Sequence, residues 1–346
     1  MSRSVSDFVN IPAGRIDCHV HFYPPAFADM LLGAQRTATP DVPLRGFGLA
    51  ANRPGWRDLA ALRRVMDETG VGLGVIIPTG NQLDMLRPAG AGATEQFNQS
   101  MSGELETAEG RFWAAALVDP FGGPAEVAQL NRSLSLPNIA AVGLVTSYAG
   151  GRTLDDPVFE PILEVARAHD VPVLVHPSAV SPAWTQALRL DSPVLESGFG
   201  FLMDDALTIL RMAINGTFDR FRDVRFMFCQ LGGFAPACCA RWNYHARHQR
   251  ARSQASGQPV PAWANRALEE YLTHIWLDTH SQDRHLIRLV TELLGDDVIV
   301  LGGDYPITPP EDGVPHVMGE LDRLGVPDST RRKIERENAM RLLGRP

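Results

Sequence analysis

Eight short apolar runs, rich in valine, isoleucine and leucine, recur along the whole chain. They lack polar alternation, which is typical of strands covered on both faces. The runs are Arg15–His19, Leu73–Ile77, Phe112–Val118, Ile139–Thr146, Pro172–His176, Val224–Cys229, Ile275–Asp278 and Val298–Leu301. Segments with helical spacing separate them, for example Trp56–Thr69, Asp156–Ala168, Asp204–Ala213 and His285–Leu294. We therefore predict an α/β fold, a single (β/α)8 TIM barrel over residues 1–346. A doubly wound open sheet is the alternative, but it normally needs fewer strands.

Two connections are unusual. The first, Tyr23–Gly55, is long and carries proline, glycine and arginine, so we expect a lid or substrate loop between the first two strands. The second, Arg247–Pro261, is polar and low in apolar residues, and we expect a mobile or interface loop there.

Composition excludes several classes of protein. The chain is 45% hydrophobic and 21% charged, so it can bury a large core and is not disordered. The net charge of −8 disfavours nucleic acid as the main partner. No stretch approaches the roughly 18 apolar residues of a membrane helix, and no apolar signal segment is visible. Adjacent Cys238 and Cys239, without CxxC pairs, fit neither a disulfide framework nor a structural zinc site. We expect a soluble, cytoplasmic protein.

Polar residues follow three of the predicted strands at their carboxyl ends, where the loops of a barrel form its site. His19 and His21 lie two residues apart and can share one metal ion. His176 ends the fifth run, and Asp304 follows the eighth. A single buried histidine is usually structural. Three histidines and one aspartate at these positions together predict a mixed nitrogen and oxygen metal site with room for water or substrate.

The same segments resemble a known family. RIDCHVHFYPP, GRTLDDPVFEPILEVARAHDVPVLVHPS and LGGDYP are similar to the amidohydrolase superfamily, in the branch of aminocarboxymuconate semialdehyde decarboxylase and the o-hydroxyaryl-acid decarboxylases. The resemblance implies a (β/α)8 barrel, a homodimer, and one divalent metal ion on His19, His21, His176 and Asp304. It also implies that Asp304 donates or accepts a proton. Zn²⁺ is our first expectation for the metal and Mn²⁺ the second, because this ligand set suits several divalent ions.

One position departs from the family. Where the family usually has a histidine that activates metal-bound water, this chain has Gln230, whose amide cannot take up a proton near neutral pH. Three interpretations follow. Substrate binds the metal directly, with Gln230 orienting it and Asp304 moving the proton. Alternatively, His280 acts as the base in place of the missing histidine. In the third, the protein has lost ordinary turnover.

Supporting residues are predicted with an ordinary structural alternative for each. Asp278, with Thr279, ends the seventh strand and is expected to accept the free N–H of a ligand histidine, or to be a strand-end cap. Asp17 precedes the paired histidines and is expected to support them as a second carboxylate, or to be a strand-end hydrogen-bonding residue.

Substrate contacts are expected from aromatic and cationic side chains. Arg241 lies where aminocarboxymuconate semialdehyde decarboxylase has an arginine that reaches into the neighbouring subunit's site, and a guanidinium there would clamp a carboxylate. Trp184 follows His176 by a short loop and could stack on a conjugated substrate. Trp56 lies among the lid arginines, of which Arg45 is the leading candidate to bind an acidic substrate, with Arg53 and Arg57 beside it. Core packing or simple solvation is the alternative for each.

Three functions remain open from the sequence. The first is a metal-dependent, non-oxidative decarboxylase of a small aromatic or conjugated acid, with the substrate chelated to the metal and Asp304 as proton donor. The second is a metal-dependent hydrolase of a cyclic ester or amide, which the same four ligands support. The third is a non-catalytic homologue that keeps its metal.

Overall fold

Eight parallel strands form one sheet that closes on itself. The computed structural model describes residues 11–28, 54–79, 83, 90, 92–148, 150–178, 189–190, 192–280 and 283–344. The strands follow the order β1-β2-β3-β4-β7-β8-β9-β10, and they are β1 (Arg15–Val20), β2 (Val71–Ile76), β3 (Phe112–Leu117), β4 (Ile139–Val145), β7 (Val173–His176), β8 (Phe226–Phe228), β9 (Ile275–Asp278) and β10 (Ile299–Val300). The backbone N–H of Cys18 donates to Leu301 O at 2.8 Å, and that of Asp304 donates to His19 O at 2.7 Å. These bonds join the last strand to the first, so the predicted TIM barrel is confirmed.

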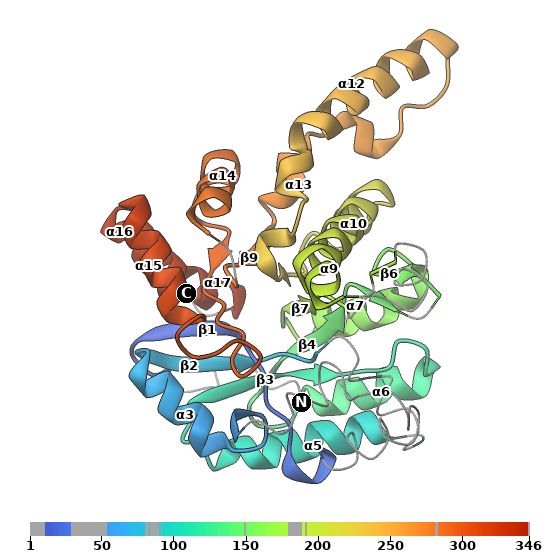
Figure 1. The fold of residues 1–346 in the computed structure, drawn as a ribbon. Coiled ribbons are helices and arrows are strands. Elements are labelled where there is room, and N and C mark those ends of the chain that lie inside the picture. Colours follow the sequence, from blue (N-terminus) through green and yellow to red (C-terminus); the bar gives the residue numbers. More distant parts are fainter. Residues whose placement is uncertain are drawn as a thin grey trace.

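Helices surround the strands (Figure 1). They are α3 (Leu59–Glu68), α5 (Ala93–Glu106), α6 (Gly123–Ser133), α7 (Glu160–Ala168), α9 (Pro193–Leu195), α10 (Phe201–Ile214), α11 (Thr217–Arg220), α12 (Cys239–Ser256), α13 (Leu268–Leu272), α14 (Arg284–Leu294), α15 (Val314–Leu324), α16 (Asp328–Arg332) and α17 (Asn338–Leu342). A short hairpin of β5 (Ser147–Tyr148) and β6 (Arg152–Thr153) follows β4. None of the described helices is long and apolar enough to cross a bilayer.

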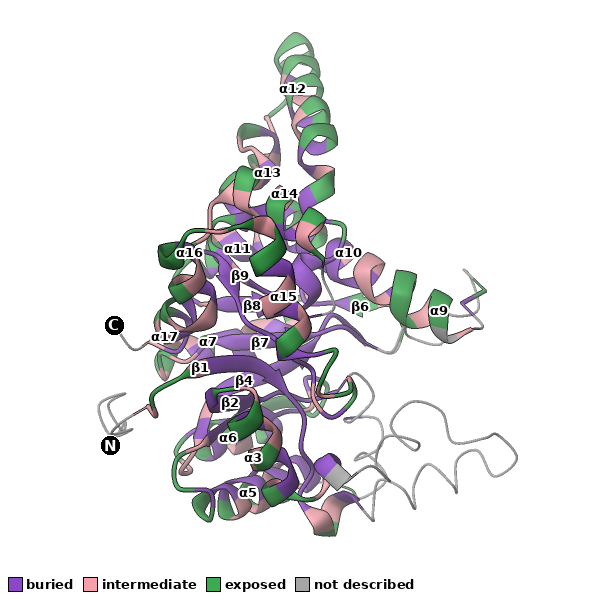
Figure 2. Cartoon of the chain, turned by 60° about the vertical axis from the view of Figure 1, so that its left-hand side comes forward, coloured by how far each residue is buried: buried purple, intermediate pink, exposed green. Residues whose placement is uncertain are grey.

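The core has two layers because successive strand side chains point to opposite faces. One cluster joins strand residues such as Phe112 and Phe226 to the inner faces of the helices. The other gathers the alternate residues, such as Leu73 and Leu174, and includes Leu342 of α17. Burial on both faces explains why the strands are continuously apolar in sequence. Figure 2 shows the sheet as an almost wholly buried centre.

The second unusual connection was predicted wrongly. Residues 247–256 are not a loop but the second half of α12, which ends at Gly257 with a left-handed φ of 67°. The segment is polar because this part of the helix projects from the barrel and is largely exposed to solvent. It still forms a helix because alanine, arginine and glutamine are good helix formers. We call residues 239–265 the arm: α12 and the returning chain, whose Trp263 packs on Trp242 with ring centroids 5.5 Å apart. Most of the first unusual connection, the expected lid Tyr23–Gly55, lies outside the described residues.

A buried pair of carboxylates on α10 provides a test of stability. Asp204 accepts hydrogen bonds from the hydroxyls of Thr146 and Ser147, whereas neither oxygen of Asp205 has a donor among the described residues. Burial raises the pKa of Asp205 well above its usual value, and the neighbouring Asp204 adds to the shift. The folded protein therefore holds a proton that the unfolded chain releases. Its unfolding free energy falls by up to about 1.4 kcal/mol per pH unit between the two pKa values.

Replacing Asp205 with asparagine should remove this pH dependence. We expect the melting temperature of Asp205→Asn to exceed that of the wild type by about 2 °C or more at pH 8, with a smaller gain at pH 5. Thermal denaturation at both pH values measures the difference. Asp312→Asn, at an exposed aspartate, is the control, and it should leave the melting temperature unchanged at both pH values. An equal effect of Asp205→Asn at the two pH values would contradict the assignment of a buried neutral acid.

Candidate metal centre

Four buried side chains converge at the carboxyl end of the barrel. His19 lies in β1 and His21 directly after it, His176 ends β7, and Asp304 follows β10. One ligand atom from each lies within 4.8 Å of the others. His19 Nε2 and His21 Nε2 are 3.2 Å apart, and Asp304 Oδ1 lies 3.1 Å from the first and 2.8 Å from the second. The structure thus brings together the four residues that the sequence predicted.

The other ring nitrogen of each histidine fixes which atom faces the centre. His19 Nδ1 donates to Asp278 Oδ2 at 2.9 Å, His21 Nδ1 to Ile77 O at 2.9 Å, and His176 Nδ1 to Pro177 O at 2.7 Å. Each Nε2 therefore presents a lone pair, and Asp304 Oδ1 has no hydrogen-bond donor among the described residues. Lone pairs that face one another at these distances repel unless a cation lies among them. Ligands about 2.0–2.2 Å from one ion have similar mutual separations, so these residues fit a divalent metal.

The charge states of two ligands, His176 and Asp304, agree with this role. Burial lowers the pKa of His176 well below its usual value, which keeps the imidazole neutral. Burial alone would raise the pKa of Asp304, but His280 and His19 outweigh it and lower that pKa well below its usual range. A neutral imidazole and an ionised carboxylate are the forms that bind metal.

The second oxygen of Asp304 contacts a different histidine. Asp304 Oδ2 lies 3.2 Å from His280 Nε2 and accepts a hydrogen bond from Thr308 Oγ1, also at 3.2 Å. His280 is buried, and burial lowers its pKa. One carboxylate therefore joins the metal ligands to a group that can carry a proton. Thr308 was not predicted, because a threonine four residues after an aspartate in a loop carries no sequence signal.

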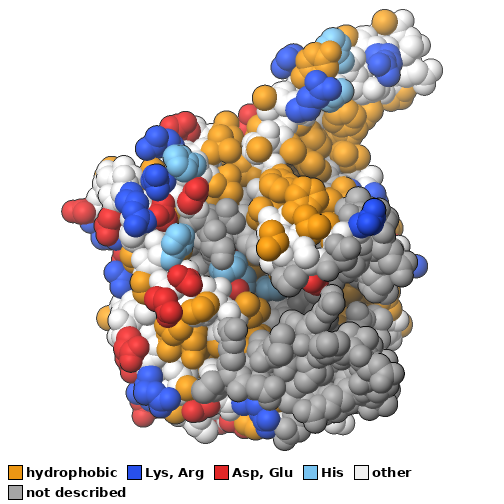
Figure 3. Space-filling view, in the orientation of Figure 1, with side chains coloured by type: hydrophobic (Ala, Val, Ile, Leu, Met, Phe, Trp, Pro, Cys, Tyr) orange, Lys and Arg blue, Asp and Glu red, His pale blue; other side chains and the backbone are white. Residues whose placement is uncertain are grey.

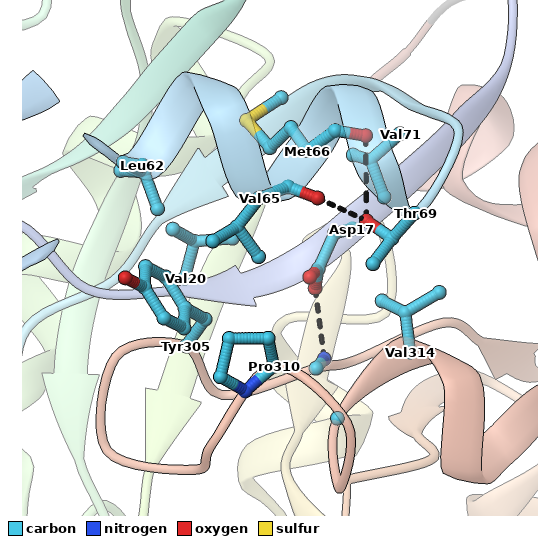
Figure 4. A pocket seen from close by; sticks show the side chains of 12 residues that line it. Asp17, Val20, Leu62, Val65, Met66, Thr69, Val71, Tyr305, Pro310 and Val314 are labelled. Carbon is cyan, nitrogen blue, oxygen red and sulfur yellow. Dashed lines mark hydrogen bonds between the residues drawn. The ribbon is translucent and has the colours of Figure 1, made fainter. Parts of the chain in front are cut away.

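Asp278 and Asp17 accept hydrogen bonds that fix the position of His19 and of neighbouring backbone segments. Asp278 Oδ2 accepts from His19, and its Oδ1 accepts the backbone N–H groups of Gln230 and His280, each at 2.9 Å. Asp17 Oδ1 accepts the backbone N–H of His19 at 3.0 Å. It also accepts the backbone N–H of Gly303 at 2.9 Å (Figure 4). Burial raises the pKa of Asp17 to about 7. The cavity beside Asp17 in Figure 4 has a volume of about 20 Å³, which is too small for a substrate.

Removing the charge of Asp278 should weaken metal binding. In Asp278→Asn the amide oxygen can keep the two backbone N–H groups, which places the amide nitrogen opposite His19. An amide nitrogen cannot accept the Nδ1–H of His19, so we expect metal affinity to fall by about 10- to 100-fold. Competition with a chromophoric chelator measures the affinity. Asp312→Asn, at an exposed aspartate, is the control with the same change of charge. Unchanged affinity in Asp278→Asn would show that the carboxylate is only a strand-end cap.

Gln230 occupies a strained position at the end of β8. Its φ is 54° and that of Leu231 is 53°, in the left-handed region that residues other than glycine seldom adopt. The turn continues through Gly233, where a Cβ atom would come within 2.0 Å of Leu202 O. The Gln230 side chain is buried, and its Oε1 has no hydrogen-bond donor among the described residues. Strain and an unsatisfied polar atom beside a ligand cluster are typical of functional positions.

The predicted substrate residues have different locations. Trp56 is fully buried and stacks on His21, with ring centroids 5.6 Å apart and planes at 9°. In this structure it therefore holds a ligand ring in place. Arg241 is exposed on the first turn of α12, and its guanidinium lies 5.3 Å from the Tyr244 ring centroid. Arg45 and Trp184 lie outside the described residues.

Comparison with known proteins assigns the family. The model of a family described as amidohydrolase matches residues 16–345, nearly the whole chain. The chain belongs to the amidohydrolase family. One relative of this amidohydrolase is the 2-amino-3-carboxymuconate-6-semialdehyde decarboxylase of Dictyostelium discoideum, 27% identical over 175 residues, or 50% of this chain and 44% of the relative. The match thus spans less than half the length of that relative.

Solved structures resemble the amidohydrolase along its length. The 5-carboxyvanillate decarboxylase LigW of Sphingomonas paucimobilis is 18% identical, with a TM-score of 0.77 over 96% of this chain and 99% of that one. A 5-carboxyvanillate decarboxylase of Novosphingobium aromaticivorans, in complex with manganese and 4-hydroxy-3-methoxy-5-nitrobenzoic acid, is 20% identical, with a TM-score of 0.74 over 95% and 96%. At these identities the likeness establishes the barrel fold.

Proposed function

We propose that this amidohydrolase is a metal-dependent carboxy-lyase that decarboxylates a small aromatic or conjugated carboxylic acid. The observation that carries the proposal is the two-sided carboxylate of Asp304, which faces the ligand cluster with one oxygen and His280 with the other. Decarboxylation needs a proton delivered to the carbon that loses CO₂, and this pair lies beside the metal ligands. The decarboxylases among the relatives and structural neighbours support the same reaction class.

The metal requirement follows from the ligand set. When bound, one divalent ion per chain would act as a Lewis acid that chelates the substrate carboxylate with an adjacent hydroxyl or carbonyl oxygen and stabilises developing negative charge. His19, His21, His176 and Asp304 would hold the ion. Zn²⁺ suits this set, and the manganese bound by a structural neighbour supports Mn²⁺ equally.

Proton movement is assigned to Asp304 and His280. In the proposal, the negative charge of the bound substrate favours the protonated form of His280. This imidazolium passes a proton from Nε2 to Asp304 Oδ2, which delivers it to the ring carbon that carries the carboxylate, and His280 is left as neutral imidazole. The bond from that carbon to the carboxylate then breaks, CO₂ leaves, and the electron pair restores conjugation. Gln230 orients the substrate through a hydrogen bond from its amide to a substrate oxygen.

Four further residues are proposed to contribute to binding the rest of the substrate. Arg241 would reach the site of the partner in a homodimer and bind a remote anionic group, and Arg45 would do so from the lid. Trp184 would stack on the conjugated part of the substrate. Trp56 would not touch the substrate but would hold the ring of His21 in place by stacking on it. The full chain, residues 1–346, would work as one catalytic unit.

Metal content and product analysis test the proposal together. The purified protein should contain about one metal ion per chain by plasma mass spectrometry, and it should release CO₂ from one or more hydroxybenzoate-type acids. A chelator should abolish the release, and added Zn²⁺ or Mn²⁺ should restore it. Metal with uptake of ¹⁸O from solvent into a cyclic ester or amide product, and no CO₂, would instead establish a hydrolase. Failure to bind either metal would refute the centre itself.

Gln230→His separates the two chemistries further. Histidine tolerates the left-handed backbone of this position better than most residues, so the variant should fold. We expect CO₂ release to change by no more than about twofold upward, because decarboxylation uses no base at this position. Hydrolysis of a lactone panel should become detectable, because the imidazole can activate water. A large rise in CO₂ release by Gln230→His would contradict this expectation, because it would show that a base at this position accelerates decarboxylation.

A further inference from the structure

A second group of potential ligands lies behind the metal centre. Cys229 directly follows β8 and Asp278 ends β9, and one ligand atom of each lies within 4.8 Å of the other and of a ring nitrogen of His19. All three side chains are fully buried. His19 belongs to both groups, because its Nε2 faces the metal centre and its Nδ1 lies 2.9 Å from Asp278 Oδ2. We call Cys229, Asp278 and the Nδ1 side of His19 the rear cluster.

The geometry of the rear cluster is close to that of a metal site. Zinc binds a thiolate at about 2.3 Å and nitrogen or oxygen at about 2.0–2.2 Å, so tetrahedral ligand atoms lie about 3.3–3.8 Å apart. Small side-chain movements would bring the rear cluster to these separations. Asp278 Oδ2 can take part because the backbone N–H groups of Gln230 and His280 both bind the other oxygen, Oδ1.

Asp205 offers an oxygen for a fourth position. Its side chain is fully buried, and neither oxygen has a donor among the described residues. The turn after Cys229 packs on the same helix, where the backbone N–H of Phe234 donates to Leu202 O at 3.2 Å, about one helical turn before Asp205. Burial raises the pKa of the Cys229 thiol well above its usual value, and the nearby carboxyl groups of Asp278 and Asp205 add to the shift.

A divalent ion in the rear cluster adds no net charge to the protein interior. Without an ion, Asp278 is ionised, because its interaction with His19 outweighs the effect of burial on its pKa, whereas the Cys229 thiol is neutral. An incoming ion displaces the thiol proton and the Nδ1 proton of His19, and both leave to solvent. Asp205 stays a neutral acid. Exchanging two protons for one divalent ion avoids the large cost of burying an uncompensated charge.

We propose that the rear cluster is a second, inhibitory metal site that takes thiophilic ions such as Zn²⁺ and Cd²⁺ but not Mn²⁺. The thiolate is a soft ligand, and Mn²⁺ prefers oxygen. An ion on Nδ1 replaces the hydrogen bond to Asp278 and withdraws electron density from the ring that binds the first ion, which weakens the first centre. The binding is independent of the proposed reaction, and only the inhibition rests on it.

An ion would reach the rear cluster through the first centre. The three side chains of the rear cluster are fully buried, whereas His176 and His280 are 5% and 7% exposed. Figure 3 shows histidine side chains visible in the middle of the face that it draws. Because the second ion must also displace two protons, it should bind more weakly than the first and fill the site only when the metal is in excess.

Titration with Cd²⁺ tests the site directly. Full-length protein that holds about one Zn²⁺ per chain should take up about one further ion from Cd²⁺, counted by plasma mass spectrometry after gel filtration. Thiolate-to-metal charge-transfer absorption in the ultraviolet should appear with it, because the first centre contains no thiolate. Cys229→Ser should keep the first ion and lose both the second ion and the absorption. Cys238→Ser is the matched control, at a half-buried cysteine outside the cluster, and should keep both.

CO₂ release tests the inhibition. Excess Zn²⁺ should lower the activity of the protein with one Zn²⁺ by about tenfold or more, and excess Mn²⁺ by less than about twofold. Cys229→Ser should retain activity within about twofold in excess Zn²⁺. Cys229→Ala is the second variant if serine in the apolar barrel interior lowers the melting temperature.

The outcomes separate this inference from the proposed function. No second ion and no thiolate absorption would refute the rear cluster as a metal site. Absorption that is lost in Cys238→Ser but kept in Cys229→Ser would refute it too, because Cd²⁺ would then bind the adjacent Cys238 and Cys239. A second ion at Cys229 without loss of CO₂ release would refute the inhibition. No CO₂ release from any acid would refute the proposed function, while ion count and absorption would still decide whether the site exists.

Discussion

Replacing Asp304 with asparagine is expected to lower turnover by about 10³-fold or more while leaving the protein folded and partly metal-loaded. The three histidines remain, and the amide oxygen can still face the ion. The amide cannot accept a proton from His280 at the position of Oδ2, which lies 3.2 Å from that ring. The loss should appear in the rate constant of the chemical step, which single-turnover measurement of CO₂ release isolates.

Two measurements make this expectation decisive. Metal content of Asp304→Asn is determined on the same preparation, so that a lost ion is not mistaken for a lost proton donor. Asp312→Asn changes the charge equally at an exposed position and should retain full activity. If Asp304→Asn with bound metal turned over at the wild-type rate, the residue would have no part in proton transfer.

Replacing His176 with alanine is expected to reduce bound metal to about 10% or less of the wild-type content after dialysis, and activity should fall in proportion. The substitution removes one of three imidazole ligands and leaves a buried space, because His176 is 5% exposed. Plasma mass spectrometry of the dialysed protein measures the loss. His274→Ala, at an exposed histidine of the same chain, should keep its metal. Full metal content in His176→Ala would show that this histidine is not a ligand.

The barrel and the ligand set could be predicted because both leave periodic or positional signals. Strands buried on two faces are continuously apolar, and His19, His21, His176 and Asp304 all lie at the carboxyl ends of such runs. The role of Asp278 was expected for the same reason. These predictions depend on the order of residues along single strands, which the sequence displays directly.

Other features depend on how distant segments meet. The polar composition of residues 247–256 suggested a loop, since a helix that projects from the body has little apolar periodicity to display. The stacking of Trp56 on His21 and the contact of Thr308 with Asp304 join loops to strand ends. The two oxygens of Asp304 could not be assigned separate neighbours without the tertiary structure.

The hydrogen bonds behind the three ligand histidines also limit how the centre can be altered. His21 and His176 donate to the main-chain carbonyls of Ile77 and Pro177, which no substitution can delete, whereas His19 donates to the side chain of Asp278. A carboxylate partner makes an imidazole a stronger electron donor than a carbonyl does. Only one of the three nitrogen ligands can therefore have its donor strength changed through its hydrogen-bond partner. Evolution or engineering that alters metal preference through these hydrogen bonds would therefore have to change the residue at position 278.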